Sequence, residues 1–205
     1  MEGKEIDISW NPALEKLLCD ESEKCSGYSW LHNRAEMLYS NRTTYLQLPI
    51  IILSAVSGFV SGAVPSSVDG VSYAVGGVGI LVSILGTINS YFGFARRAEA
   101  HRIASVHNGQ ISRAIRIEMN LPRQQRTPPK VLLKMIKEDL KRLSETAPRI
   151  PVEIIAEYKN SVMKHQPTAT HPDICNGIEE VEPLGEVVAV GAITPTFSRG
   201  VRVEI

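Results

Sequence analysis

Few residues in this sequence have the types and spacing that enzymatic chemistry requires. Ser161 and Lys164 stand in a Ser-x-x-Lys spacing, which serine acyl enzymes use to pair a nucleophilic hydroxyl with a lysine. No companion motif accompanies it, so chance explains the spacing better. The glycine-rich run GGVG at 76–79 lies in an apolar stretch, with no Lys-Ser or Lys-Thr after it. It is therefore not a phosphate-binding loop.

The histidines and cysteines do not form a metal-binding pattern. His165, His171 and Cys175 are irregularly spaced, and only an accident of folding would bring them onto one ion. His101 and His107 lie among arginines on a predicted helix, where we expect lipid headgroups. We therefore predict a protein that is not an enzyme and that holds no cofactor or metal.

Charge is unevenly distributed along the 205 residues, although the formal net charge is zero. Residues 43–95 are almost uncharged, whereas 96–160 are rich in Arg, Lys and Glu. A neutral total predicts no nucleic-acid partner, because no overall field attracts phosphates. Three cysteines, an odd number, favour free thiols in a reducing compartment. The start, MEGKEIDISWNP, lacks the pattern of a secretory signal.

The uncharged region contains two stretches long enough to cross a membrane. Between Arg42 and Arg96 the only charge is Asp69, and spanning a bilayer takes about 20 apolar helical residues. The windows at about 45–64 and 71–94 both meet this requirement, and the short link PSSVDG makes them antiparallel neighbours. The alternative is a buried helical hairpin in a soluble protein, but the remaining chain is too small and charged to cover it. We predict a transmembrane hairpin.

Arginines flank this hairpin on one side only. They are Arg34, Arg42, Arg96, Arg97 and Arg102. Since cytoplasmic flanks of membrane helices are enriched in Lys and Arg, we expect both termini in the cytoplasm, or facing a capsid, with these arginines at the headgroups. The acceptor sequence at Asn41 would then never be glycosylated. The spans carry no ionisable side chain, which argues against a pump or transporter.

Small residues recur every four positions on each span. They are Ser54, Gly58 and Gly62 on the first, and Gly79, Ser83 and Thr87 on the second. In lipid, small residues let helices pack closely. The simpler interpretation is that these helix-packing stripes face each other within the hairpin. The other is that a stripe pairs hairpins into homo-oligomers, even around a pore.

The polar regions are predicted to be mostly helical. Asn11 is placed to cap a short helix within residues 1–27. A helix from about residue 28 runs into the first span, so 28–95 form one unit. Residues 96–164 form a cytoplasmic helical stalk, in which the second span continues to Leu121-Pro122, Thr127 caps a helix with Pro128 at its first position, and another helix starts near Pro151.

The last segment, 165–205, has a different composition. It is rich in Pro, Gly and Thr and contains two β-prone runs, at 186–193 and 201–205. It is either disordered or an extended arm that adds strands to a partner's sheet. We favour the arm, because disordered tails are usually poorer in Val and Ile.

The order of these segments resembles a known family. The sequence has WLHNRAEMLYSNRTTY, the hairpin, FARRAEAHRIASVHNGQISRAIRIEM, a capped helix and then APRIPVEIIAEY. Over residues 28–160 this is similar to the SLATT-like two-span membrane proteins, especially those of large DNA viruses of eukaryotes. The likeness rests on Arg34-Ala35, on Ala98 and His101, and on the Pro148-x-Ile150-Pro151 element.

The resemblance implies two functions. Bacterial SLATT proteins are regarded as pore-forming effectors of nucleotide-sensing defence systems, whereas viral relatives look like virion membrane components. This chain carries no attached sensor domain and has a β-prone tail, and both departures disfavour an effector acting alone.

We therefore expect an all-α integral membrane protein with a two-helix transmembrane hairpin, a cytoplasmic helical stalk and an extended, β-prone C-terminal tail. Its partners would be the lipid bilayer and, through residues 166–205, a capsid or other structural protein, and its place the inner membrane of a large DNA virus. The alternatives are an oligomeric pore-forming effector and a membrane protein directed at the host.

Overall fold

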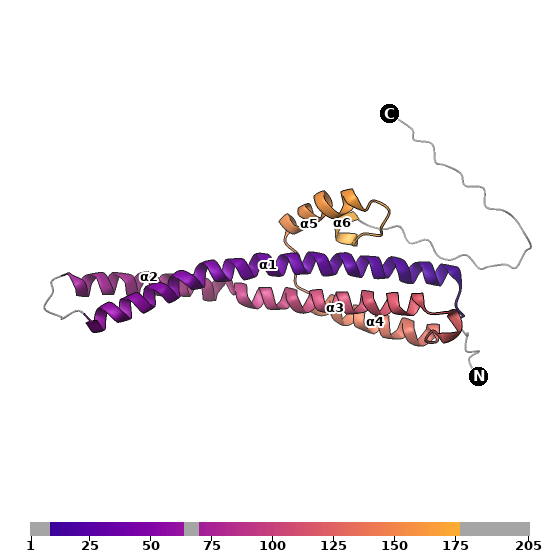
Figure 1. Cartoon of the computed structure of the whole chain (residues 1–205), viewed down its shortest axis with the longest axis horizontal. Helices are drawn as coiled ribbons and strands as arrows, with labels where there is room; N and C mark the ends of the chain where they lie inside the picture. Colours follow the sequence, from indigo (N-terminus) through magenta and orange to yellow (C-terminus); the bar gives the residue numbers. More distant parts are fainter. Residues whose placement is uncertain (1–8, 64–69, 177–205) are drawn as a thin grey trace, which may run out of the picture.

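The computed structural model describes residues 9–63 and 70–176, and every regular element in these ranges is helical. Figure 1 shows an elongated hairpin in which the first long helix lies along the next two, with further helices on both sides of its polar half. The predicted all-helical class is confirmed for this part of the chain. Most of the predicted link between the spans, including Pro65 and Asp69, lies outside the described residues, as do both β-prone runs.

Helix α1 (Pro12–Ala63) has 52 residues and includes both the polar N-terminal region and the first apolar window. Asn11 begins it as predicted, because the Asn11 side-chain oxygen accepts the backbone N–H of Leu14 at 2.8 Å. The expectation of a separate short helix before residue 28 is wrong, since α1 continues without a break through Gly27 and Pro49. At 1.5 Å per residue, α1 is about 78 Å long.

Helices α2 (Val71–Phe92) and α3 (Phe94–Asn120) return along α1 and are separated by one residue, Gly93. The sequence predicts one continuous helix here, whereas Gly93 has left-handed dihedrals, φ 56° and ψ 40°. Only glycine adopts this conformation at little cost. Helix α3 then ends before Leu121-Pro122, as predicted.

Along the inner face of the hairpin, buried or half-buried positions recur at alternating intervals of three and four residues. In α1 these buried or half-buried positions are Leu18, Ser22, Cys25, Ser29, His32, Glu36, Tyr39, Thr43, Leu46, Ile50, Leu53, Ser57 and Val60. The returning helices show the same alternation, with one step of five between Asn89 and Phe94. A 3.5-residue repeat is the pattern of coiled-coil packing, and Gly93 lies where its register changes.

Helix α4 (Pro129–Thr146) covers the polar end of α3 after a 3₁₀ turn (η1, Arg123–Gln125). It starts one residue later than predicted, and Thr127 does not cap it. Instead, the Thr127 hydroxyl and backbone N–H donate to the Glu118 carboxylate at 2.8 and 3.1 Å. Among the apolar residues of α4, Leu132, Ile136 and Leu143 are buried whereas Met135 is 55% exposed.

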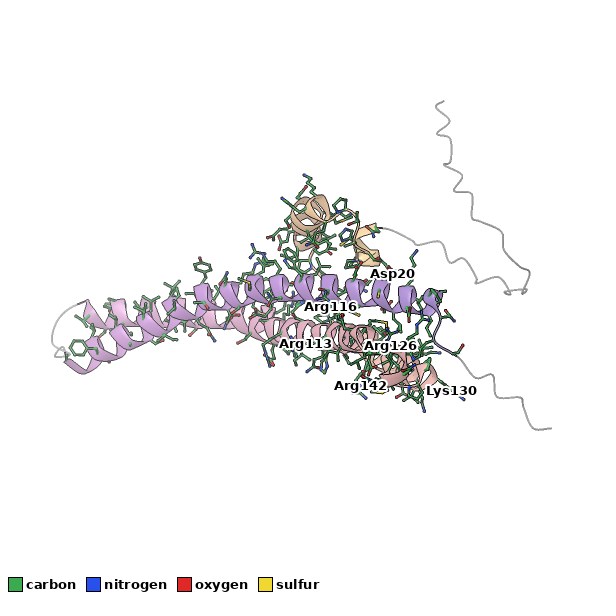
Figure 2. All side chains as sticks on the ribbon, turned by 45° about the vertical axis from the view of Figure 1, so that its right-hand side comes forward. Asp20, Arg113, Arg116, Arg126, Lys130 and Arg142 are labelled. Carbon is green, nitrogen blue, oxygen red and sulfur yellow. The ribbon has the colours of Figure 1, made fainter. Side chains whose placement is uncertain are left out.

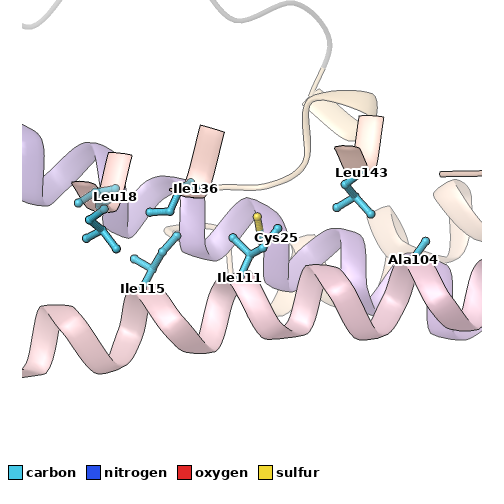
Figure 3. Close-up of a cluster of buried hydrophobic side chains, with 8 residues drawn as sticks. Leu18, Cys25, Ala104, Ile111, Ile115, Ile136 and Leu143 are labelled. Carbon is cyan, nitrogen blue, oxygen red and sulfur yellow. The ribbon is translucent and has the colours of Figure 1, made fainter. Parts of the chain in front are cut away.

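These three α4 residues complete the core of the stalk. Figure 3 shows the cluster, which consists of Leu18, Cys25, Ala104, Ile111, Ile115, Leu132, Ile136 and Leu143. Because α1, α3 and α4 all contribute, the stalk is a three-helix arrangement that includes the polar half of α1 as well as the predicted residues 96–164. Its stability comes mostly from burying these side chains.

Helix α5 (Val152–Tyr158) begins after Pro151 as predicted, continues into a π-helical turn (η2, Lys159–Met163), and is followed by the short α6 (Asp173–Asn176). A second core, made of Leu31, Ala35, Ile154, Tyr158 and Cys175, holds these elements on α1. The sequence predicts an extended arm from residue 165, but residues 165–176 fold back onto α1 because His171, Pro172 and Cys175 are buried there.

Candidate functional site

The apolar half of the hairpin is the most distinctive surface of the molecule. The most apolar 18-residue windows in α1 and in the stretch from α2 into α3 have mean hydropathies of 1.7 and 1.9, and none of their residues is buried. Both helices are therefore long and apolar enough to cross a membrane. Figure 2 places its labelled charged residues, Asp20, Arg113, Arg116, Arg126, Lys130 and Arg142, on the stalk, away from this half. Large apolar side chains instead point outward, among them Ile51, Phe59, Tyr73, Ile80 and Ile84.

The predicted small-residue stripes do not close the hairpin. A Cβ atom added to Gly58, Gly62 or Gly79 would meet no atom within 4 Å, and Ser54 is exposed. Branched side chains fill the seam instead, including Ile50, Leu53 and Val60 from α1. The expectation that the stripes face each other is therefore wrong, and they lie on the outer surface.

The hydroxyls of the second stripe bond within their own helix. Ser83 donates to the carbonyl oxygen of Gly79 at 2.9 Å, and Thr87 donates to that of Ser83 at 2.8 Å. These bonds satisfy polar groups that no water would reach in an apolar medium. The outer face of α2 consequently has no unpaired hydroxyl at these two positions.

Four of the five predicted topology arginines make contacts within the protein. Arg34 pairs with Glu157 at 2.8 Å and Arg42 with Glu153 at 3.1 Å, which ties α5 to α1. Arg102 pairs with Glu99 on its own helix at 2.7 Å. The Arg97 guanidinium lies 5.9 Å from the centre of the Tyr39 ring. The arginines are thus partly structural, a role that sequence reasoning missed.

A buried histidine pair lies where the apolar hairpin meets the stalk. The Nδ1 atoms of His32 on α1 and His101 on α3 are 2.9 Å apart, and both side chains are almost fully buried. The Tyr39 ring stacks on His101 at 5.5 Å between ring centres and on Phe94 at 6.2 Å. His101 therefore does not lie at the headgroups as expected from sequence, because it faces the other helix.

Burial sets the protonation state of this pair. It lowers the pKa of His32 to about 4, with repulsion from His101 as a smaller cause, and it also lowers the pKa of His101. Both rings are consequently neutral at pH 7. One Nδ1 then donates its proton to the other, so the pair is a hydrogen bond between neutral rings.

Beyond the histidine pair, two pairs of serines form further polar contacts between α1 and α3 along the stalk. The Ser22 hydroxyl donates to the carbonyl oxygen of Ser112 at 3.1 Å. Ser29 and Ser105 each donate to the other's carbonyl oxygen at 2.9 Å. Side chain to backbone bonds in both directions require the helix axes to lie close together. The serines occupy the predicted helices, but only their three-and-four spacing would have indicated that they face each other.

The isolated chemical motifs take structural roles. The Ser161 hydroxyl donates to the Glu157 carbonyl oxygen at 2.7 Å, so it is engaged within its helix. His171 contacts the Tyr158 hydroxyl at 3.1 Å and the Gln166 carbonyl oxygen at 3.0 Å. Within residues 9–63 and 70–176, no three His, Cys, Asp or Glu side chains gather around one point in a way that would hold a metal ion.

Comparisons with known proteins give no further lead: no protein-family model, no curated protein and no solved structure matches the chain. The geometry of the hairpin and of its junction with the stalk is therefore the basis for the functional argument.

Proposed function

We propose that the end of α1 and α2 cross a lipid bilayer as a hairpin and that the stalk stands on one side of it. The observation that carries the proposal is the exposure of the apolar windows, of which no residue is buried. A core helix of a soluble protein would bury much of such a window. The 22 residues of α2 span about 33 Å, close to the hydrocarbon thickness of about 30 Å.

In the proposed orientation, both chain ends lie on the cytoplasmic or capsid-facing side. Arg34, Arg42, Arg96, Arg97 and Arg102 flank the spans on the stalk side, which agrees with the bias of cytoplasmic flanks toward Lys and Arg. The side chains of Arg42 and Arg102 are 44% and 58% exposed. They can bind anionic headgroups as well as their carboxylate partners.

Within this frame we assign the protein a structural role: it anchors the inner membrane of a large DNA virus to the surrounding protein shell. The stalk supports this role because a charged helical arrangement with its own core can hold a binding segment at a fixed distance from the bilayer. The viral setting rests on the resemblance to SLATT-like proteins over residues 28–160, and the binding segment is the β-prone tail. The chain would not act as an enzyme.

Photo-crosslinking in the native membrane tests this role. A photoreactive residue at Val188 or Val203, one in each β-prone run, should attach to a structural protein of the shell. The matched control is the same residue at Lys141, an exposed position on α4, which should not. Attachment only to other copies of the chain would contradict the anchor.

The outer face of α2 favours a second candidate, an oligomeric pore of the SLATT type. A shallow groove on this face is lined by Gly76, Gly79, Ser83 and Thr87, together with Ile80, Ile84 and Ile88. Such a face allows another helix to approach closely. Gly79→Ile should dissociate an oligomer and stop ion leakage from vesicles, whereas Leu81→Val, at an exposed position outside the groove, should change neither. A monomer that does not leak excludes the pore.

A further inference from the structure

A cavity in the stalk lies at the meeting point of four helices. It has a volume of about 300 Å³ and is lined by residues of α1, α3, α4, the segment between α4 and α5, and α6. Leu140, Leu143 and Ile150 form much of its apolar wall. Sites for small molecules begin at about this volume and are mostly apolar, with a few placed polar groups.

Two buried polar side chains, His32 and Asn108, line the same cavity, and each is only 3% exposed. The Nδ1 atom of His32 is hydrogen-bonded to His101, and the side-chain amide of Asn108 donates to the carbonyl oxygen of Ala104 at 2.9 Å. No partner for His32 Nε2 or Asn108 Oδ1 is found among the described residues.

Both of these atoms reach open space. In the described part of the chain, Trp10 Nε1 is the one fully enclosed side-chain nitrogen or oxygen without a partner. The space that His32 and Asn108 share is the cavity. Because both residues line the cavity, we take Asn108 Oδ1 and His32 Nε2 to be the atoms that face it. Buried polar atoms of this kind normally have a hydrogen-bond partner.

The cavity disfavours charge. Burial raises the pKa of Cys25 to about 12, raises the pKa of Tyr28, and lowers the pKa of His32 to about 4. All three groups line the cavity and are neutral at pH 7. Glu21 and Arg149 also line the cavity and carry opposite formal charges, so the lining offers an ion no excess of either sign. Because burial would also penalise an ionised ligand, we expect an uncharged occupant.

We infer that this cavity binds a small uncharged molecule with an apolar body and one end that carries adjacent hydrogen-bond donor and acceptor atoms, as in a primary amide. The donor would bond to Asn108 Oδ1. The acceptor would receive the proton of His32 Nε2, which is present when His32 Nδ1 accepts from His101. Neither contact depends on the proposed membrane role.

Three fluorinated probes test the inference on the full-length protein in nanodiscs. They are 4-fluorobenzamide, 4-fluorobenzoate and 4-fluorotoluene, whose binding is followed by ¹⁹F NMR against empty nanodiscs. The amide should bind with a Kd on the order of 1 mM, as expected for about ten heavy atoms. The carboxylate and the toluene should bind at least tenfold more weakly.

Two variants locate the site. Ser144 is exposed at the cavity edge, so Ser144→Trp can fold while it fills the space, and it should abolish amide binding. Asn108→Leu should weaken amide binding at least tenfold and leave toluene binding unchanged. The inference is overturned if the native protein does not bind the amide, if Ser144→Trp binds it equally well, or if toluene and amide bind alike.

Discussion

Ser29 on α1 and Ser105 on α3 each donate a hydroxyl to the other's backbone carbonyl at 2.9 Å. This reciprocal pair fixes the separation of the two helices, because a larger side chain at either position would displace the opposite backbone. Gly109 supports the same close approach, since a Cβ atom there would lie 3.3 Å from the Ser29 hydroxyl. The stalk therefore begins as a tightly joined pair of helices.

Size at position 29 should consequently matter more than polarity. Ser29→Ala removes one hydroxyl and should lower the free energy of unfolding by about 1 kcal/mol. Ser29→Leu must push the helices apart and should cost at least about 2 kcal/mol. Thermal unfolding of the protein in nanodiscs, followed by circular dichroism, measures both. Cys19→Leu, at an exposed α1 position, is the control, and an equal loss there would refute the argument.

Acid should loosen the junction between hairpin and stalk. His32 has a folded pKa of about 4 against an ordinary value of 6.5, so the unfolded chain binds more protons between these two values. Stability is therefore complete above pH 6.5 and falls as the pH drops toward 4, by roughly 2 to 3 kcal/mol.

This pH dependence is measured by unfolding at pH 7.0 and pH 4.5. The double variant with His32→Phe and His101→Phe removes both buried rings whose pKa is lowered, so it should lose most of the difference between the two values. His165→Phe serves as the control because His165 is exposed, and it should retain the difference. A full pH response that survives the double variant would show that groups other than the histidine pair cause it.

Gly27 should be essential for holding α5 and α6 on α1. A Cβ atom there would lie 2.6 Å from two carbons of Pro172 and 2.8 Å from the Tyr158 hydroxyl. Gly27→Ala should therefore detach this part of the chain and speed tryptic cleavage after Lys159 several-fold. Gly58→Ala, which meets open space, should leave the cleavage rate unchanged. Equal rates for the two variants would contradict the packing.

The pairing of Arg42 with Glu153 can be separated from a headgroup role by exchanging the charges. Arg42→Glu should raise the rate of tryptic cleavage after Lys159, although only slightly, because an exposed ion pair contributes less than about 1 kcal/mol. The double variant Arg42→Glu with Glu153→Arg should restore the native rate. Without such rescue, Arg42 would act mainly on lipid.

The apolar windows and the main helix boundaries follow from sequence because they depend on local properties. Asn11 caps α1, Leu121-Pro122 ends α3, and Pro151 precedes α5, and each rests on backbone chemistry within one turn. The predicted cap at Thr127 is wrong because the Glu118 carboxylate, on the preceding helix, accepts hydrogen bonds from the Thr127 hydroxyl and N–H.

The partners of each helix face were not predictable in the same way. Four-residue spacing identified Gly58 and Gly62 as one face of α1, but it could not indicate that the seam lies on another face. The pairing of His32 with His101 depends on contacts between residues far apart in sequence, and so does the docking of residues 165–176 on α1. Polar residues at seam positions were the available signal.

The orientation of the hairpin is the central claim, and sided cysteine labelling in sealed native vesicles tests it most directly. Cys19 is exposed on the stalk, and Ser67→Cys introduces a thiol into the sequence PSSVDG that links the two apolar stretches. An impermeant maleimide should label Cys19 from the cytoplasmic side only and the thiol at position 67 from the opposite side only. Labelling of both thiols from the same side would contradict a membrane-crossing hairpin.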